Sequence, residues 1–582
     1  MKVSFYMLMA MSLIITQINA DEPTPTTTEE VDEVMVTSSI LNTSRILNPL
    51  YVIDGDEIKD DATTSLGEAV DSYLGVSIAD YGAAVGQPII RGMSGPRVKI
   101  LKNGMVNRDV SGLGVDHLND VDLHDIEQIE IIKGPSSLLY ANGTIGGIIN
   151  VVNNTIARED FDGQEVNAGL ETQSANDGDI QEFNYKNLIG GWLNFSLGYK
   201  NTELGNFDVP DNAVIHDDDH DEEMLSYIEN SDFASEGKQF GISRTGDWGY
   251  FGIGYDNLES LYGIPFHGDE HEDEETLPHA DDDDDHDEHE GERIFSTTDQ
   301  TSYNLAGLYN INGSLVNSVS YNWRDTEYSL TEAHAEEEGH DDHAGEDEHA
   351  PTVFMNDATE YGAIFDLSTG AFTQKVAFNF VDEDSSIVGE EAFMNPANSE
   401  EFTLGYFVST DLDLFYIDAG FRIDQIERTG SVTDEDHAGE IDYYKIDDDT
   451  NSFAISLGRD LSDSLDISLG FASVERLPSV IELFMNGPHM ATGRLETGNP
   501  NLQSETSDNF DITLNFDNGN FYASASYYVN DVDNYITLQD ELDDHDDHDE
   551  PNATADPHAH PEHANLIHAN YIQEDAEFKG YE

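Results

Sequence analysis

From residue 163 to residue 582 the chain alternates large apolar residues with small polar ones, and turns separate the alternating segments. Leu193 to Tyr199 and Leu465 to Phe471 are two of these segments. A period of two predicts β-strands whose two faces meet different surroundings. Lipid outside and a polar lumen inside would produce this pattern in a transmembrane barrel, and a soluble β-sandwich would produce the same alternation.

The connections between the strands favour the barrel. Tight turns at Asn312-Gly313, Thr369-Gly370 and Asp517 to Gly519 alternate with long polar connections. Outer-membrane barrels have short periplasmic turns and longer extracellular loops. We therefore predict an outer-membrane barrel over residues 163–582.

The first residues predict export. Met1-Lys2 is a short basic start, Val3 to Ile15 is mostly apolar, and Ala20 precedes the acidic Asp21. The apolar run is shorter than the ~20 residues that a membrane-spanning helix needs. We predict a signal peptide over residues 1–20, cleaved after Ala20.

Residues 46–157 have a different pattern, in which short β-branched runs alternate with Gly and Pro. This pattern predicts a small, tightly turned mixed sheet, with a short helix from Ser65 to Tyr73. This region contains Arg91-Gly92, then Arg97-Val98, and then the run from Ile126 to Asn153. The order and separation of these segments resemble those of the plug domain of TonB-dependent outer-membrane receptors.

The resemblance implies an all-β transmembrane barrel with an N-terminal α+β plug in its lumen, in a Gram-negative outer membrane, and we expect it to be monomeric. Val34-Met35-Val36-Thr37, in a polar leader over residues 21–45, resembles the TonB box, which pairs with the TonB energy-coupling protein.

About 16 strands can be counted, whereas about 22 are expected around a plug of this size. We therefore expect the chain to be C-terminally incomplete and unable to close as a barrel.

Charge limits the possible ligands. The chain has 120 acidic and 24 basic residues, which gives a formal net charge of −96. Recognition of phosphate and carboxylate groups needs Arg and Lys, so nucleic acid and anionic substrates are poor candidates for partners. Cations are the expected ligands. The sequence also has no Cys, which removes thiolate from the possible metal ligands.

Histidine is concentrated in four acidic connections. Imidazole among carboxylates suits Zn²⁺, Ni²⁺ or Cu²⁺. We interpret these loops as weak sites that collect metal ions at the mouth of the barrel; solvated acidic loops are the alternative. Of the 21 His residues, 17 lie there: His216, His220, His267, His271, His279, His286, His289, His334, His340, His343, His349, His545, His548, His558, His560, His563 and His568.

A tight site needs ligands on rigid elements. Asp116-His117 lies in the plug, and His489 lies in a stretch, Glu475 to Glu505, that resembles the zinc-uptake branch of these receptors. The resemblance implies one zinc site made by these three residues and a wall acid.

The wall acid of this set has three candidates. Glu327 is the first candidate, although strict alternation would turn it toward lipid. Glu332 and Glu391 are the alternatives. His124 is expected to be structural.

The sequence therefore predicts a TonB-dependent receptor that imports a divalent transition metal, with Zn²⁺ as the expected cargo and nickel, copper and manganese left open. A haem or ferric-siderophore receptor of the same fold is one alternative. A cell-surface protein that sequesters metal without transporting it is another. No catalytic constellation has a suitable context, so we do not expect an enzyme.

Overall fold

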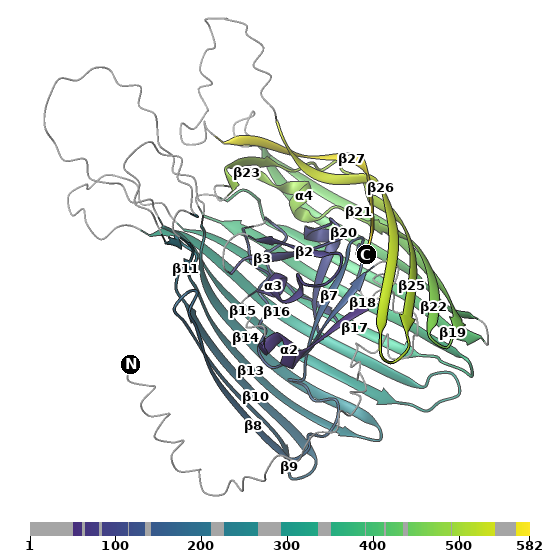
Figure 1. Cartoon of the computed structure of the whole chain (residues 1–582). Helices are drawn as coiled ribbons and strands as arrows, with labels where there is room; N and C mark the ends of the chain where they lie inside the picture. The colour runs from purple at the N-terminus through teal and green to yellow at the C-terminus, as the bar shows by residue number, and fades with distance from the viewer. Residues whose placement is uncertain are drawn as a thin grey trace, which may run out of the picture. The chain divides into compact units, whose positions relative to one another are not determined.

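The structure is a computed structural model, shown in Figure 1. It describes residues 50–60, 65–80, 84–114, 116–133, 141–210, 213, 226–265, 293–335, 351–389, 392–412, 415–434, 440–489, 492–541 and 566–582. The signal peptide and TonB box predicted above lie outside these residues. Within them, no helix has the length and apolar character needed for a membrane span.

The plug is a mixed sheet, as the Gly- and Pro-punctuated pattern predicts. Its strand order is β1-β6-β7-β4-β5, with a parallel β4–β7 pair and antiparallel neighbours elsewhere. The elements are β1 (Leu50–Asp54), α2 (Gly55–Asp60), α3 (Leu66–Val70), β2 (Val76–Asp80), β3 (Gly86–Ile90), η1 (Gly95–Arg97), β4 (Val98–Lys102), β5 (Met105–Val106), β6 (Ile126–Lys133) and β7 (Gly147–Asn153).

The predicted helix of the plug is shorter than expected. The hydroxyl of Ser65 caps α3 by accepting a hydrogen bond from the Glu68 N–H at 3.2 Å. The helix ends at Val70, and the chain then turns through residues 71–75 into β2. Gly75, with a φ of +72°, supplies the left-handed conformation that this turn requires.

The wall is one large sheet with the strand order of a barrel, and antiparallel registers link its long strands in chain order. Sixteen of the described strands are ten residues or longer, in agreement with the predicted count, and two short strands, β23 and β24, raise the sheet to 18. The long strands are β8 (Gln164–Gln173), β9 (Gly178–Ile189), β10 (Leu193–Leu204), β13 (Phe233–Gly246), β14 (Gly249–Gly263), β15 (Arg293–Asn310), β16 (Ser318–Ala335), β17 (Thr352–Asp366), β18 (Phe372–Val388), β19 (Ala397–Leu412), β20 (Phe415–Asp434), β21 (Glu440–Ser462), β22 (Leu465–Arg476), β25 (Glu505–Asp517), β26 (Tyr522–Asp540) and β27 (Ile567–Tyr581).

The remaining elements are short additions to the wall. The strands β11 (Phe207–Asp208) and β12 (Tyr227–Ile228) form a two-stranded sheet. Between β22 and β25 lie α4 (Val480–Phe484), β23 (Asn486–His489) and β24 (Arg494–Thr497). This insertion lies outside the run of long wall strands, because β22 pairs directly with β25.

The wall strands alternate as predicted. On β21, Phe453 and Ile455 are 46 % and 47 % exposed, whereas Ser452 and Ser456 on either side of them are almost fully buried. Large apolar side chains therefore face outward and small polar ones face the plug, which is the arrangement of a barrel with lipid outside.

A buried cluster of charged residues joins the plug to this wall. Arg97 of the plug donates through Nε to Oε1 of Glu505 on β25 at 3.1 Å, and Arg476 of β22 donates to Oε2 of the same carboxylate at 2.5 Å. Arg476 also donates to both oxygens of Glu482 on α4, at 2.9 Å each. We call Arg97, Arg476, Glu482 and Glu505 the anchor cluster. Figure 1 labels the plug elements α2, α3, β2, β3 and β7, drawn in purple to dark blue, and the anchor-cluster elements α4, β22 and β25, drawn in green.

Candidate metal-binding site

Side chains hold the plug loop that carries Asp116 and His117 by making hydrogen bonds to the backbone of the loop. Gln87 donates through Nε2 to the carbonyl oxygens of Ser111, Gly114 and His117, at 2.9, 2.6 and 2.8 Å. The Asp109 carboxylate accepts from the N–H and hydroxyl of Ser111 at 3.1 and 2.6 Å. These contacts stabilise a loop that has no regular secondary structure.

The wall supplies His489 through the insertion between β22 and β25. Ser479 and Glu482 form a capping box at the start of α4, and Arg476 holds the Glu482 carboxylate. After α4 the chain enters the β23–β24 hairpin, and the Asn486 N–H donates to the Phe393 carbonyl at 2.7 Å. The His489 ring stacks on Phe393 with ring centroids 4.9 Å apart. The hairpin therefore places His489 in a fixed orientation.

Asp116, His117 and His489 converge, and one ligand atom from each lies within 4.8 Å of the other two. The Asp116 Oδ2 atom is 3.4 Å from Nε2 of His117 and 3.4 Å from Nε2 of His489. All three side chains are at most 3 % exposed. The structure thus brings together the three residues that the sequence placed in a tight site, and we call them the upper cluster.

Burial and charge set the protonation of the upper cluster. Burial lowers the pKa of His117 below its usual value. Burial also opposes the charged form of the other two residues, but their mutual attraction outweighs it. The pKa of Asp116 lies well below its usual value because of His117 and His489, and the pKa of His489 lies well above its usual value because of Asp116 and Glu496. At neutral pH, Asp116 is therefore anionic, His489 is cationic and His117 is neutral.

Glu496 of β24 is a member of this site that the sequence analysis did not identify. Its Oε1 atom lies 3.1 Å from Nδ1 of His489. Gly487 pairs with Glu496 in the hairpin, so Glu496 and His489 are diagonal neighbours on one face. The alternation of the two short strands around their turn could have indicated this pair.

Several buried polar atoms of the site have no hydrogen-bond partner among the described residues. They are Oδ1 of Asp116, Nδ1 and Nε2 of His117, and Oε2 of Glu496. Buried polar groups are rarely left unpaired in native proteins, so such atoms need an explanation. Two imidazoles and a carboxylate are a suitable ligand set for a tetrahedral Zn²⁺, which requires one further ligand.

Neither of the two described candidates for the wall acid belongs to the upper cluster. Glu327 pairs with Thr301 in an uninterrupted β15–β16 register, and its side chain is exposed on the outer face. The bulge that would turn it inward does not occur in β16, so the prediction that Glu327 is a ligand is wrong. Glu332 is buried, with Oε2 3.5 Å from the Ser296 hydroxyl, and it is not a member of the three-residue group. Glu391 lies outside the described residues.

The predicted capture loops fall almost entirely outside the described residues, as do Val34 to Thr37. Of the 17 loop histidines, the structure describes the backbone of His334 in β16 and the exposed His568 in β27. Metal capture by the loops stays a prediction.

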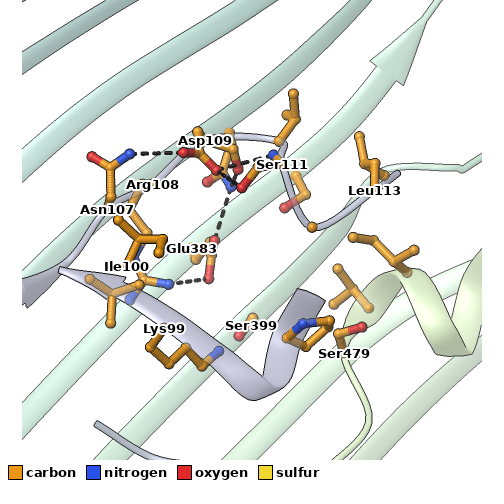
Figure 2. Close-up of a pocket in the computed structure, with 18 of the residues that line it drawn as sticks. Lys99, Ile100, Asn107, Arg108, Asp109, Ser111, Leu113, Glu383, Ser399 and Ser479 are labelled. Atoms are coloured by element: carbon orange, nitrogen blue, oxygen red, sulfur yellow. Dashed lines mark hydrogen bonds and ion pairs between the residues drawn. The ribbon is translucent and has the colours of Figure 1, made fainter. Parts of the chain in front are cut away.

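A cavity of about 220 Å³ lies beside the upper cluster, between the plug and the wall. Phe354 lines it and also contacts the His117 ring edge-on at 5.3 Å. Figure 2 shows Lys99 in this cavity and the 2.9 Å ion pair between Arg108 and Glu383. Burial lowers the pKa of Lys99 to about 8. Lys99, Arg108, Arg422 and Arg428 line this cavity together with Asp109, Glu360, Glu383 and Glu401, so its bases and acids balance and it offers a cation no excess of negative charge.

Comparisons with known proteins agree with this architecture. The family described as "TonB dependent receptor-like, beta-barrel" matches residues 232–582, and the "TonB-dependent Receptor Plug Domain" matches residues 42–148. The vitamin B12 transporter BtuB of Vibrio vulnificus is 22 % identical over 511 residues, which cover 87 % of this chain and 71 % of that protein.

Solved structures show the same fold at low sequence identity. The copper transporter OprC has a TM-score of 0.67 at 14 % identity, over 91 % of this chain and 76 % of its own. The Serratia marcescens hemophore receptor HasR, solved with its hemophore HasA and haem, has a TM-score of 0.66 at 13 % identity, over 91 % and 78 %. The ferric enterobactin receptor PfeA of Pseudomonas aeruginosa has a TM-score of 0.61 at 13 % identity, over 91 % and 76 %.

The relatives carry different cargoes, so the fold alone does not specify the ligand. The family consists of receptors and transporters of the Gram-negative outer membrane that work with TonB. Its two domain types cover this chain in the expected order, with the plug joined to the wall through buried ion pairs. The chain belongs to the family of TonB-dependent outer-membrane receptors.

Proposed function

We propose that this receptor imports a divalent transition metal ion, with Zn²⁺ as its cargo, and binds it at the upper cluster. The observation that carries the proposal is the convergence of Asp116, His117 and His489 within 4.8 Å, in a buried position where polar atoms lack partners. The plug supplies two of the ligands and the wall supplies the third. Movement of the plug would therefore separate the ligands and release the ion.

The charges of the site support a cation as the cargo. Asp116 is anionic, and His117 is kept neutral by burial, so both present lone pairs, whereas His489 has to release its proton to solvent when the metal ion binds. Glu496, beside Nδ1 of His489, can orient that ring and increase its basicity, as carboxylates next to metal-binding histidines do. The formal charge of −96 would concentrate cations near the protein.

The first test is metal binding by the full-length protein in detergent, measured by competition with a chelator. Asp116→Asn/His117→Gln should remove one tight Zn²⁺ equivalent and leave the weak capacity of the acidic loops. Glu327→Gln, which changes an exposed acid on β16, is the matched control and should bind as the unaltered protein does. Retention of the tight equivalent by the double variant would place the site elsewhere.

The second test separates transport from sequestration. Deletion of residues 33–38 should abolish TonB-dependent uptake of ⁶⁵Zn²⁺ by cells and preserve surface binding, because the segment resembles the TonB box. Equal uptake with and without the deletion would favour a protein that only sequesters metal. Competition by Cu²⁺, Ni²⁺, Mn²⁺, haem and cobalamin in the same assay would rank zinc against the cargoes of the relatives.

A further inference from the structure

Beyond the upper cluster, the plug segment that follows His117 runs along the inner face of the wall and presents acids and an imidazole to it. Asp120 accepts from the Ser260 hydroxyl of β14 at 3.2 Å, and Asp122 accepts from Nε2 of Gln239 of β13 at 3.0 Å. The ring of His124 then reaches β9. The contacts move from β14 to β13 to β9, in the order in which these strands follow one another around the wall.

The first two of these contacts also move along the strands toward the short turns. The register joins Ser260 to Ser235 of β13, and Gln239 lies four residues further along that strand. Gln239 is level with Gly198 of β10, which is level with Asn184 of β9. Four strand residues correspond to ~13 Å. The segment thus descends from the upper cluster, away from the long connections of the wall.

His124 ends this descent in an environment that resembles that of His489. Its Nδ1 atom lies 3.5 Å from Oε2 of Glu182, as Nδ1 of His489 lies 3.1 Å from Oε1 of Glu496. A carboxylate at Nδ1 favours the tautomer in which Nε2 carries the free lone pair. Neither ring nitrogen of His124 has a hydrogen-bond partner among the described residues, although the side chain is fully buried, and Nδ1 has only the 3.5 Å approach to Glu182.

A second unpartnered atom faces the same space. Asn184 is 2 % exposed, and its Oδ1 atom has no hydrogen-bond partner among the described residues. A Cβ atom built on Gly198 would lie 3.1 Å from this oxygen and 3.2 Å from Nε2 of His124. Both atoms therefore lie close to Gly198, and any side chain at residue 198 would crowd them.

We propose that His124 and Asn184 form a lower cation site, oriented by Glu182, that receives the metal ion after it leaves the upper cluster. This inference rests on the proposed function. An imidazole nitrogen and an amide oxygen, with water completing the shell, suit a divalent transition metal. Asp120 and Asp122 lie between the two sites. A site with two protein ligands is weak, which allows the ion to move on. The proposal gives His124 a role in transport, whereas the sequence predicted a structural role for it.

Crystals of the full chain soaked in Co²⁺ test the site directly, because anomalous scattering separates it from the acidic loops. We expect a peak at the upper cluster and, at millimolar Co²⁺, a second peak between His124 and Asn184. Gly198→Ala should lose only the second peak, because the new methyl group would crowd both donor atoms. No second peak in the unaltered protein would overturn the lower site. A second peak without the first would instead overturn the proposed function of the upper cluster.

Uptake of ⁶⁵Zn²⁺ by cells tests the role in transport. His124→Gln and Gly198→Ala should reduce uptake at sub-saturating zinc about tenfold, within the range seen when groups that support a metal site are lost. Both should keep the tight Zn²⁺ affinity of the upper cluster. Gly405→Ala is the matched wall control, since its Cβ would meet Ala377 at an ordinary 3.7 Å. Normal uptake by both variants would contradict the proposal.

Discussion

The anchor cluster and the upper cluster both join the plug to the wall through buried charged groups, but their hydrogen bonding differs. In the anchor cluster, two arginines meet two glutamates, and each carboxylate oxygen accepts at least one hydrogen bond. In the upper cluster, Asp116, His117 and Glu496 each retain at least one buried atom without a partner among the described residues. The carboxylates of the anchor cluster are fully hydrogen-bonded within the protein. The upper cluster keeps unpaired atoms that can bind a ligand.

The two clusters are connected through α4. Glu482 belongs to the anchor cluster and caps this helix, and the chain that leaves the helix carries His489. The paired cluster thus positions a ligand of the unpaired one. A buried ion pair that loses one partner destabilises a protein strongly, whereas a ligand site can lose a donor at lower cost. Four variants test the difference between the paired groups of the anchor cluster and the buried groups that lack such pairing.

The largest effect is expected from Glu505→Ala in the anchor cluster. The substitution leaves Arg97 and Arg476 buried without their shared acceptor, so the free energy of unfolding should fall by about 3–5 kcal/mol. Urea unfolding of the detergent-solubilised protein measures the change. Asp508→Ala alters an exposed acid on the same strand and should change stability little. Equal losses in the two variants would contradict a special role for the anchor cluster.

Gly114→Ala should reduce metal affinity without removing a ligand. The new Cβ atom would lie 2.2 Å from Oδ1 of Asp116 and 2.9 Å from Cε1 of His489, so the carboxylate must move. We expect about a hundredfold weaker Zn²⁺ binding in chelator competition, equivalent to about 2.7 kcal/mol. Gly112→Ala is the control in the same loop, since its Cβ would meet only Ile481, at 3.9 Å. Unchanged affinity in Gly114→Ala would mean that Asp116 is not a ligand.

Glu496→Gln should have a smaller effect on the same affinity. It keeps the size of the side chain but removes the charge beside Nδ1 of His489, so the ring is less basic and less well oriented. Loss of such a supporting carboxylate lowers metal affinity by about 10- to 100-fold. Calorimetry with Zn²⁺ measures the change. A loss as large as that of the Asp116→Asn/His117→Gln variant would instead make Glu496 a direct ligand.

The smallest effect concerns Asp120, a buried acid with no basic partner comparable to those in the anchor cluster. Burial raises the pKa of Asp120 to about 7. Between the ordinary pKa of an aspartate, near 4, and pH 7, the folded protein holds a proton that the unfolded chain releases, so this group makes stability fall as pH rises. Asp120→Asn should therefore show a smaller decrease in melting temperature from pH 5 to pH 8. An unchanged pH profile would show that Asp120 is ionised throughout.

Patterns of local origin were predictable from the sequence. Alternation with a period of two identified the wall, because neighbouring side chains of a strand face opposite sides whatever the rest of the chain does. The plug followed from its short β-branched runs and turn residues. Asp116, His117 and His489 were identified through a resemblance that rests on contiguous motifs, and the structure brings them together.

Contacts across the fold were decided only by the tertiary structure. His489 and Asp116 are 373 residues apart, and no local period specifies that they meet. Glu327 remains on the outer face because β16 keeps an uninterrupted register, and Glu496 takes the position beside His489 because a hairpin pairs it there. His124 and Asn184 can both approach Gly198 of a third element, β10, because this residue has no side chain. The sequence therefore specified which residue types and strands are present, and the register and packing of distant strands determined which side chains share a site.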